Sequence, residues 1–421
     1  MRVVVVGAGV VGLCAALALR REGAEVTVLD RASVDHGASA ANAGWVVPVL
    51  SAPLSGPGAL AEAARATLRG HGSVGVRPAA GLLGWVGGFL RSAHADRHRE
   101  GLRAVLALGA RSVELFDELR LSGVEFEMHR RGLLIAARSR AGLASAEALV
   151  AAARAAGYEG ETRMHVGPAV QALEPALADS VAGVVHAVAD AHVRPESLLA
   201  GLRAALLREG ATVRGGIAVR GVERDGAGWV VATTSGAAPA DRVVIAAGVE
   251  SARLLRELGL RVPLLPGKGH SVTASGTGTT PAHPIKLLEA NLACSPFDGG
   301  VRLSGRFELG ARGDHARVRA LRRIRAGAAR YLRDWEPVEA GSAIAGMRPA
   351  TPDSLPVIGA VPGHDGVFTA TGHGTLGLTL APATAAALAP LVLRGVSAPE
   401  LAPFPVERFA GRRSATRLEG V

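Results

Sequence analysis

Three glycines close to the N-terminus have the spacing that binds the phosphates of a dinucleotide. Gly7, Gly9 and Gly12 form a G-x-G-x-x-G pattern. In such a pattern the glycines permit a tight turn, close approach of the backbone to a pyrophosphate, and close packing of a helix on a strand. Asp30 follows at the distance expected of a carboxylate that accepts hydrogen bonds from a ribose. The pattern predicts a dinucleotide site, against the alternative of a plain tight turn. The positions between the glycines that join this site are Ala8, Val10 and Val11.

The segments around these glycines have the order that the pattern requires. Val3–Val6 is a β-branched run typical of a buried parallel strand, Leu13–Arg20 is rich in alanine and leucine as helices are, and Glu25–Leu29 is a second apolar strand. Unpaired N–H groups at the helix start favour anionic phosphates. We therefore assign the N-terminal run to a nucleotide-binding fold rather than to a signal peptide.

The composition sets the scale of the molecule. The chain has 421 residues, of which 48% are hydrophobic, so it predicts about two to four domains with large buried cores. Only two cysteines are present, Cys14 and Cys294. They exclude a disulfide framework, and no cysteine or histidine spacing indicates a metal site. We expect no metal and a reducing compartment.

The charge is strongly positive but spread out. The formal net charge is +10, and of 47 basic residues only Lys268 and Lys286 are lysines. The arginines form no long basic tract, and aromatic residues make up 3% of the chain, which offers no stacking platform for single-stranded nucleic acid. We expect no nucleic-acid partner.

Two apolar stretches bear on membrane contact. Leu376–Leu393 is interrupted by Pro382 and Pro390, so we expect no transmembrane span and a cytoplasmic location. Ala79–Leu90 precedes the basic stretch Arg91–Arg99. It predicts a buried helix, or alternatively a membrane or subunit contact.

Further helices and strands are predicted from periodicity and turn residues. The helices are Leu102–Leu121, Ala141–Ala156 and Pro195–Arg208, and a hairpin is expected over Phe126–Ala137. Strands are expected at Ala182–Val188, Thr212–Val213, Ala218–Glu223, Trp229–Thr233 and Arg242–Gly248. An antiparallel sheet is expected from Pro263–Thr273, Ile285–Ala293 and Val301–Gly305.

Several motifs, in order along nearly the whole chain, resemble those of FAD-dependent amine oxidoreductases. The chain is most similar to the small subunit of D-amino-acid dehydrogenase, with glycine, sarcosine and hydroxyproline oxidases as neighbours. The C-terminal motifs are the most specific. The motifs are the opening glycines, Ala41–Gly44, Asp190–Pro195, Ala246–Gly248, Gly346–Asp353, Pro356–Gly359 and Gly372–Gly377.

The resemblance implies an α/β fold class with two domains. A discontinuous Rossmann-like FAD-binding domain is expected over residues 1–50, 100–122, 182–262 and 342–421. A substrate-binding domain of α+β type, built on an antiparallel sheet, is expected over residues 51–99, 123–181 and 263–341.

The resemblance also implies which residues hold FAD. The glycine-rich turn that ends at Gly377 leads into a predicted helix, whose N–H groups would face the flavin N1–C2=O edge and stabilise its negative charge. His373 would add a donor there, or serve as a structural histidine. Beyond the opening glycines and Asp30, the expected FAD contacts are Arg31, Ala41, Asn42, Ala43, Gly44, Val219, Ala246, Ala247, Gly248, Gly346, Arg348, His373, Gly374, Thr375, Leu376 and Gly377.

The resemblance places the arginine that binds the substrate carboxylate at Arg348. A guanidinium matches a carboxylate with two parallel hydrogen bonds; the alternative is a salt bridge, for example to Asp353. Hydride transfer from Cα to flavin N5 would convert the C–N bond of a small amino acid to an imine, which hydrolyses to an oxo acid and an amine. His270 is a candidate base, and Lys268 is either a cation near the flavin or a surface charge.

Two departures from the related sequences leave the substrate open. His270 stands where tyrosine is usual, and Ile344 stands where tryptophan is usual. Alternatives are an oxidase of a secondary or N-substituted amino acid, and a flavin subunit that needs a partner chain. The electron acceptor is oxygen or a quinone. Lys268 or Lys286 near the flavin would favour oxygen, and a homo-oligomer is left open.

Overall fold

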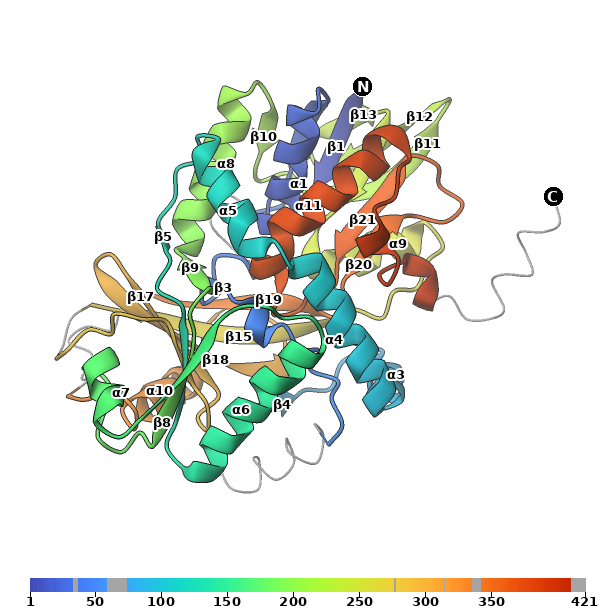
Figure 1. The fold of residues 1–421 in the computed structure, drawn as a ribbon. Coiled ribbons are helices and arrows are strands. Elements are labelled where there is room, and N and C mark those ends of the chain that lie inside the picture. The colour runs from blue at the N-terminus through green and yellow to red at the C-terminus, as the bar shows by residue number, and fades with distance from the viewer. Residues whose placement is uncertain (33–36, 59–73, 276–277, 314, 335–341, 410–421) are drawn as a thin grey trace.

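The computed structural model describes residues 1–32, 37–58, 74–275, 278–313, 315–334 and 342–409. Figure 1 shows two halves stacked on one another. One half holds both ends of the described chain around a six-stranded sheet, and the other is built on a nine-stranded sheet.

The six-stranded sheet has the order β10-β2-β1-β14-β21-β20. Its strands are parallel except β20. They span Arg2–Val6 (β1), Glu25–Leu29 (β2), Thr212–Arg214 (β10), Arg242–Ile245 (β14), Val357–Ala360 (β20) and Val367–Thr371 (β21). The helices over this sheet include α1 (Val10–Arg21), α8 (Pro195–Arg208) and α11 (Gly377–Arg394).

The nine-stranded sheet has the order β19-β15-β18-β17-β16-β6-β8-β7, with β4 paired to β18. Most pairs are antiparallel, whereas β16–β6 and β18–β4 are parallel. The strands are Val74–Val76 (β4), Leu133–Ala137 (β6), Thr162–Val166 (β7), Gly183–Ala187 (β8), Leu265–Ala274 (β15), Ile285–Leu287 (β16), Leu292–Phe297 (β17), Gly300–Leu309 (β18) and Ala343–Ala350 (β19).

Smaller elements connect the two halves. A three-stranded sheet of β3 (Trp45–Val46), β9 (Ala191–Val193) and β5 (Met128–His129) lies between them. A second three-stranded sheet consists of β11 (Val219–Asp225), β12 (Gly228–Thr233) and β13 (Gly236–Ala240). The remaining α-helices of the described residues are α3 (Leu82–Ser92), α4 (Ala95–Gly109), α5 (Ser112–Leu121), α6 (Arg140–Ala155), α7 (Pro168–Leu173), α9 (Ser251–Glu257) and α10 (Val318–Ala328).

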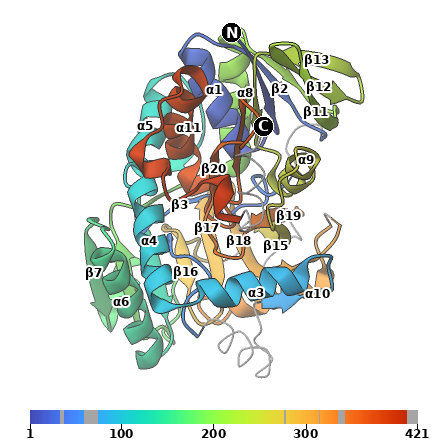
Figure 2. The same cartoon turned by 90° about the vertical axis from the view of Figure 1, so that its right-hand side faces the viewer.

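The two faces of the large sheet have different surroundings. Figures 1 and 2 show α10 on the side of β15 and β18 that is turned away from the nucleotide-binding half. We call the face toward the nucleotide-binding half the front face and the face toward α10 the back face. Because side chains alternate along a strand, each residue of β15 belongs to one face.

Most predicted elements are confirmed, and four predictions are wrong. Phe126–Ala137 is no hairpin, because β5 pairs with β9 and β6 pairs with β8. Leu102–Leu121 is divided between α4 and α5, where a Cβ on Gly109 would lie 2.9 Å from Leu380 of α11. Ile285–Ala293 is divided between β16 and β17. The predicted domain limits place 182–188 and 342–350 with the nucleotide-binding half, whereas β8 and β19 belong to the large sheet.

The prolines do not interrupt the C-terminal helix. Pro382 and Pro390 both lie inside α11, although each costs about 3 kcal/mol in a helix interior. Packing of α11 against α1 in the main core offsets this cost. Of the described helices, α11 alone has the length and apolar composition to cross a bilayer, and 67% of it is buried in the fold, as in the core helix of a globular domain.

The apolar stretch Ala79–Leu90 forms most of α3, which packs on the large sheet. Trp85 and Phe89 are buried, and the Trp85 indole donates to the carbonyl of Ala350 (2.9 Å). Leu83 stays 89% exposed. The prediction of a packed helix is therefore confirmed for one side of it.

Candidate active site

The glycine turn and α1 form a cradle for an anion. A Cβ on Gly7 would lie 2.4 Å from the carbonyl of Ala246, and one on Gly12 would lie 2.0 Å from the carbonyl of Gly7, so both positions require glycine. Gly9 caps α1 without a side-chain hydrogen bond. The N–H of Val10 donates to Ser39 Oγ (3.0 Å). These residues fit the phosphates of a dinucleotide, since N–H groups at a helix start point to the place of the ligand.

Asp30 lies at the end of β2 next to this turn. Its carboxylate accepts from the N–H groups of Ala8 (2.6 Å) and Ala32 (2.8 Å). These bonds leave lone pairs for a ribose hydroxyl, because an ionised carboxylate has about four acceptor sites. Arg31 instead pairs with Glu250. The carbonyl of Val219 accepts from Arg253 (2.6 Å).

Three segments that are far apart in the sequence meet above the large sheet. The carbonyl of Ala41 accepts from Ser271 Oγ of β15 (2.7 Å), and Thr379 of α11 donates to the carbonyl of Trp45 (3.0 Å). The Gly374 N–H donates to the carbonyl of Pro349 (3.1 Å). The structure thereby brings together the predicted cofactor residues 41–44, 346–348 and 373–377.

Glycines also shape this junction. Gly44 has φ +86°, and a Cβ on it would lie 2.1 Å from the carbonyl of Val193. A Cβ on Gly346 would lie 2.7 Å from Cα of Ala38. The Asn42 side chain accepts from the Gly44 N–H (2.8 Å). Near the strand end, Gly248 and Gly374 have positive φ and open space around the Cβ position, which is room for a ligand.

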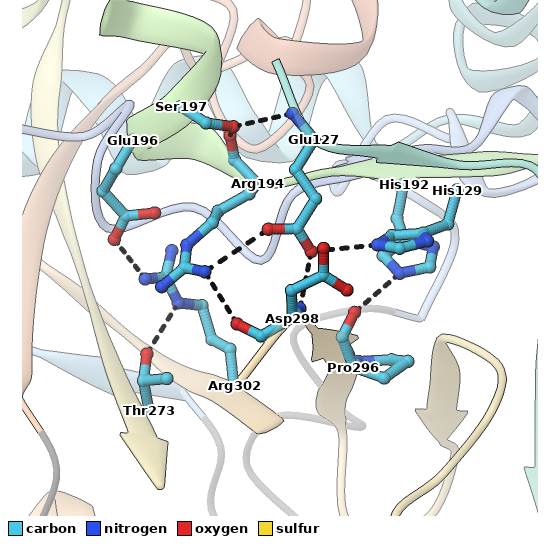
Figure 3. Close-up of polar contacts among 10 residues, drawn as sticks. All are labelled: Glu127, His129, His192, Arg194, Glu196, Ser197, Thr273, Pro296, Asp298 and Arg302. Carbon is cyan, nitrogen blue, oxygen red and sulfur yellow. Dashed lines mark hydrogen bonds and ion pairs between the residues drawn. The ribbon is translucent and has the colours of Figure 1, made fainter. Parts of the chain in front are cut away.

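Arg302, a buried arginine of β18, also belongs to this junction and was not predicted from the sequence. Its guanidinium donates to the carbonyls of Ala40 and Asn42 (both 3.1 Å) and to Thr273 (3.1 Å). It also pairs with Glu196 at the start of α8 (Figure 3). Arg302 therefore fixes the 40–42 loop against the front face. Its signal in the sequence is weak, because it is one of many arginines.

The front face of β15 is bare where Arg348 lies. A Cβ on Gly269 would lie 1.8 Å from Arg348 Nη1, and one on Gly267 would lie 2.2 Å from the ring of Phe307. The Arg348 guanidinium and the Phe307 ring thus occupy the space that side chains at the two glycines would fill. Burial lowers the pKa of Arg348 to about 10, so the guanidinium is charged at neutral pH but poorly hydrated. Asp353 pairs with Arg408 instead, which removes the alternative salt bridge.

Lys268 and His270 do not join Arg348. Both alternate with Gly269 along β15 and lie on the back face, where His270 Nδ1 accepts from the Arg317 N–H (3.3 Å). The His270 and Glu308 side chains approach to 3.7 Å. The sheet therefore separates both residues from Arg348. This contradicts the expected roles of His270 as the base and of Lys268 as a cation beside the flavin.

Lys286 lies on the front face. Lys286 pairs with Ala293 on β17, Ala293 pairs with Ser304 on β18, and Ser304 pairs with Ser271 on β15. Paired residues point to the same side of a sheet, and Ser271 is on the front face. Its ammonium donates to Asn291. Burial lowers the pKa of Lys286 to about 8. The structure therefore separates the two lysines, one on each side of the sheet.

His373 is a satisfied core histidine. It is 3% exposed, and its Nε2 contacts Thr384 Oγ1 of α11 (3.1 Å). Burial lowers the pKa of His373 to about 4. Its ring is thus committed to the interior, and only its backbone is left to meet a cofactor.

One group of potential metal ligands is present in the described part of the chain. Glu127, His129 and Asp298 each place a ligand atom within 4.8 Å of the others. Glu127 accepts from His129 (2.9 Å), from the Asp298 N–H (2.8 Å) and from Arg194 (3.3 Å), as Figure 3 shows. The Arg194 guanidinium occupies the Glu127 carboxylate, for which a metal ion would have to compete. These contacts therefore indicate a structural network that ties β5 to the β17–β18 turn.

Comparison with known proteins agrees with this geometry. Residues 2–391 match the family described as FAD dependent oxidoreductase. The chain is 33% identical to D-amino acid dehydrogenase 2 of Ralstonia nicotianae, over 97% of this chain and 100% of that protein. It is 32% identical to D-amino acid dehydrogenase of Methylobacterium nodulans, over 96% and 97%. The glycine oxidase structure from Geobacillus kaustophilus has a TM-score of 0.77 and 25% identity, over 97% and 100%.

The family match covers both halves of the fold, including the α1 cradle, the Arg348 strand and most of α11. It confirms the predicted family, fold class, cofactor and enzyme class. The chain belongs to the FAD dependent oxidoreductase family and is an FAD-dependent enzyme.

Proposed function

We propose that this enzyme oxidises the C–N bond of an α-amino acid, with Arg348 holding the substrate carboxylate. The observation that carries the proposal is the half-buried guanidinium of Arg348, which lies over Gly269 on the front face and whose pKa is lowered by desolvation. A poorly hydrated cation in such a place gains most from an anionic partner, and a carboxylate fits its planar fork.

Bound FAD supplies a hydride acceptor for the substrate Cα. The chain's own residues orient the substrate: Arg348 fixes the carboxylate, and the absence of a side chain at Gly269 lets the Arg348 guanidinium lie close to the sheet. The helix start at α11 contributes N–H groups and a dipole that stabilise negative charge nearby. The loop 40–42, held by Arg302, limits the position of the cofactor relative to Arg348.

We infer a D-amino acid with an apolar or small side chain as substrate. The full-length relatives are named D-amino acid dehydrogenase, and Phe307 lies beside Arg348 over Gly267, where it offers an apolar contact. A glycine-like or secondary amino acid is the second candidate, because the glycine oxidase structure shares the fold over its full length.

We assign no side-chain base among the residues that the structure describes. His270 lies behind the sheet, so the substrate amine must enter neutral or lose its proton to water. Deprotonating an amine of pKa near 10.4 at pH 7 costs about 4–5 kcal/mol. The positive charge of Arg348 and burial both lower the pKa of the amine, which reduces this cost.

The test is anaerobic reduction of the FAD-loaded enzyme by a panel of amino acids. The readout is the loss of flavin absorbance. We expect saturable bleaching by apolar D-amino acids, and little with their L-enantiomers. Bleaching by sarcosine or glycine alone would favour the second candidate. No bleaching by the purified chain would mean that a partner chain is required or that the donor is not an amino acid.

A further inference from the structure

A hollow of about 230 Å³ lies on the back face of the large sheet, away from Arg348. Segments from three parts of the chain meet there: the end of β4, the strand β18, and the first turns of α10. We call it the arginine pocket. Its lining is Arg77, Arg306, Glu308, Arg317, Arg319, Ala320 and Arg323.

The charge of this lining is unbalanced. Five guanidinium groups face one carboxylate, that of Glu308, among the described residues that line the hollow. Glu308 is 2% exposed and accepts from Arg306 (3.0 Å), with Arg317 at 3.5 Å. Its role is to hold two of the arginines in place. Arg77, Arg319 and Arg323 are added around them, so positive charge remains in excess.

The position of α10 increases this excess. Arg317 is the N-cap of α10 and Arg319 lies in its first turn, where no acidic residue is found. The N-terminal end of a helix dipole is positive, so cations are unfavourable there and anions are favoured. Arginines concentrated at this end become favourable when an anion lies between them.

Two buried polar atoms at or near the pocket also have no partner within hydrogen-bond distance. They are Oε2 of the lining residue Glu308 and His270 Nε2, which lies 3.7 Å from it. Buried polar groups are usually satisfied. The Glu308 oxygen faces the cations of the lining, and His270 Nε2 is available as a donor in one tautomer.

We propose that the arginine pocket binds a small phosphate-bearing anion. A tetrahedral phosphate accepts guanidinium forks from several directions, whereas a single carboxylate is planar and suits one fork. The volume suits a phosphate group with a small organic part. The site is separate from the FAD cradle at Gly7–Gly12 and from Arg348, and it does not depend on the identity of the amino-acid substrate.

The experiment is calorimetric titration of the FAD-loaded enzyme with inorganic pyrophosphate at low ionic strength. Loading with FAD occupies the other phosphate site, and retention of flavin absorbance confirms that it stays occupied. The test variant is Arg319→Gln combined with Arg323→Gln. The matched control is Arg322→Gln, an exposed arginine of the same helix that does not line the pocket. Circular dichroism melting checks that all three proteins fold.

We expect pyrophosphate to bind the wild type one-to-one, and the double variant to bind at least about tenfold more weakly, since charge-assisted bonds are lost. Arg322→Gln should change the affinity less than about threefold, with weakening by salt in all cases. Equal losses in both variants would mean diffuse surface attraction and would overturn the site. No pyrophosphate binding, or binding only to vesicles that contain phosphatidylglycerol, would also overturn it. Tighter binding of succinate than of pyrophosphate would reject the phosphate class.

Discussion

The two faces of β15 make opposite use of one short sequence. On the front face, Gly267 and Gly269 leave a bare surface under Phe307 and Arg348. On the back face, Lys268 and His270 are buried beside Glu308. The predicted base His270 and the neighbouring Lys268 lie behind the sheet, while the residues beneath Arg348 and Phe307 on the front face are glycines.

This contrast shows that a catalytic surface needs room as much as it needs functional groups. Glycines at these positions let the Arg348 guanidinium and the Phe307 ring lie close to the sheet. The titratable groups on the other face stabilise the fold and hold the arginines of the pocket. Four measurements test this division between the faces.

The largest effect is expected from Arg348 on the front face. Arg348→Leu leaves the substrate carboxylate buried without its partner, which costs about 2–5 kcal/mol and predicts at least about a thirtyfold loss of apparent affinity. FAD absorbance should be unchanged. Arg348→Lys keeps the positive charge but loses the two-pronged guanidinium, so its apparent affinity for the substrate should lie between those of the wild type and of Arg348→Leu. Rapid-mixing reduction by a D-amino acid measures this, and wild-type behaviour of the leucine variant would place the carboxylate elsewhere.

A methyl group under the guanidinium should have the next largest effect. In Gly269→Ala, Cβ would lie 1.8 Å from Arg348 Nη1, so the guanidinium must move. A displacement of about 1 Å costs on the order of 10- to 100-fold in rate. Gly87→Ala is the control, because nothing lies within 4 Å of its Cβ position. Measurement of kcat/KM for both variants tests whether Arg348 needs a glycine beneath it. Equal values for Gly269→Ala and Gly87→Ala would contradict this.

The two lysines form a matched pair across the sheet. If oxygen is the acceptor, the front-face Lys286 stabilises the developing anion, and Lys286→Met should slow reoxidation about tenfold, on the order of 1.4 kcal/mol. Lys268→Met should stay within about twofold. Stopped-flow mixing of the reduced enzyme with dissolved oxygen measures both. A larger effect of Lys268→Met than of Lys286→Met would contradict the assignment of faces. Slow reaction of the reduced wild type with oxygen, together with fast turnover on a soluble quinone, would show a dehydrogenase.

The smallest effect is a pH dependence of stability from the back face. Burial lowers the pKa of His270 to about 4, below its value of about 6.5 in the unfolded chain. The unfolded state therefore binds more protons, so the His270 contribution to stability is constant above about pH 6.5 and falls as the pH drops toward 4, by up to about 3 kcal/mol. His270→Gln should reduce this slope and leave kcat at pH 7.5 within about twofold. Melting temperatures of the FAD-loaded proteins between pH 7.5 and 4.5 measure it, and an unchanged slope would contradict the shift.

The sequence alone determined the cofactor half and the order of most elements. Gly7, Gly9 and Gly12 carry a local conformational requirement, and runs such as Glu25–Leu29 and Pro195–Arg208 have clear periodicity. These signals depend only on residues that are close together in the chain, so they can be read without knowledge of the fold. The motif around Arg348 was recognisable for the same reason.

Only the tertiary structure decided which residues share a face and a site. The register between β15, β18 and β19 places His270 and Lys268 behind Arg348 and places Lys286 in front. Arg302 gained its role because β18 passes under the 40–42 loop, and α11 kept two prolines because α1 packs against it. Strand register and helix packing depend on contacts between distant segments, and the alternation of side chains makes one residue of shift enough to exchange the two faces.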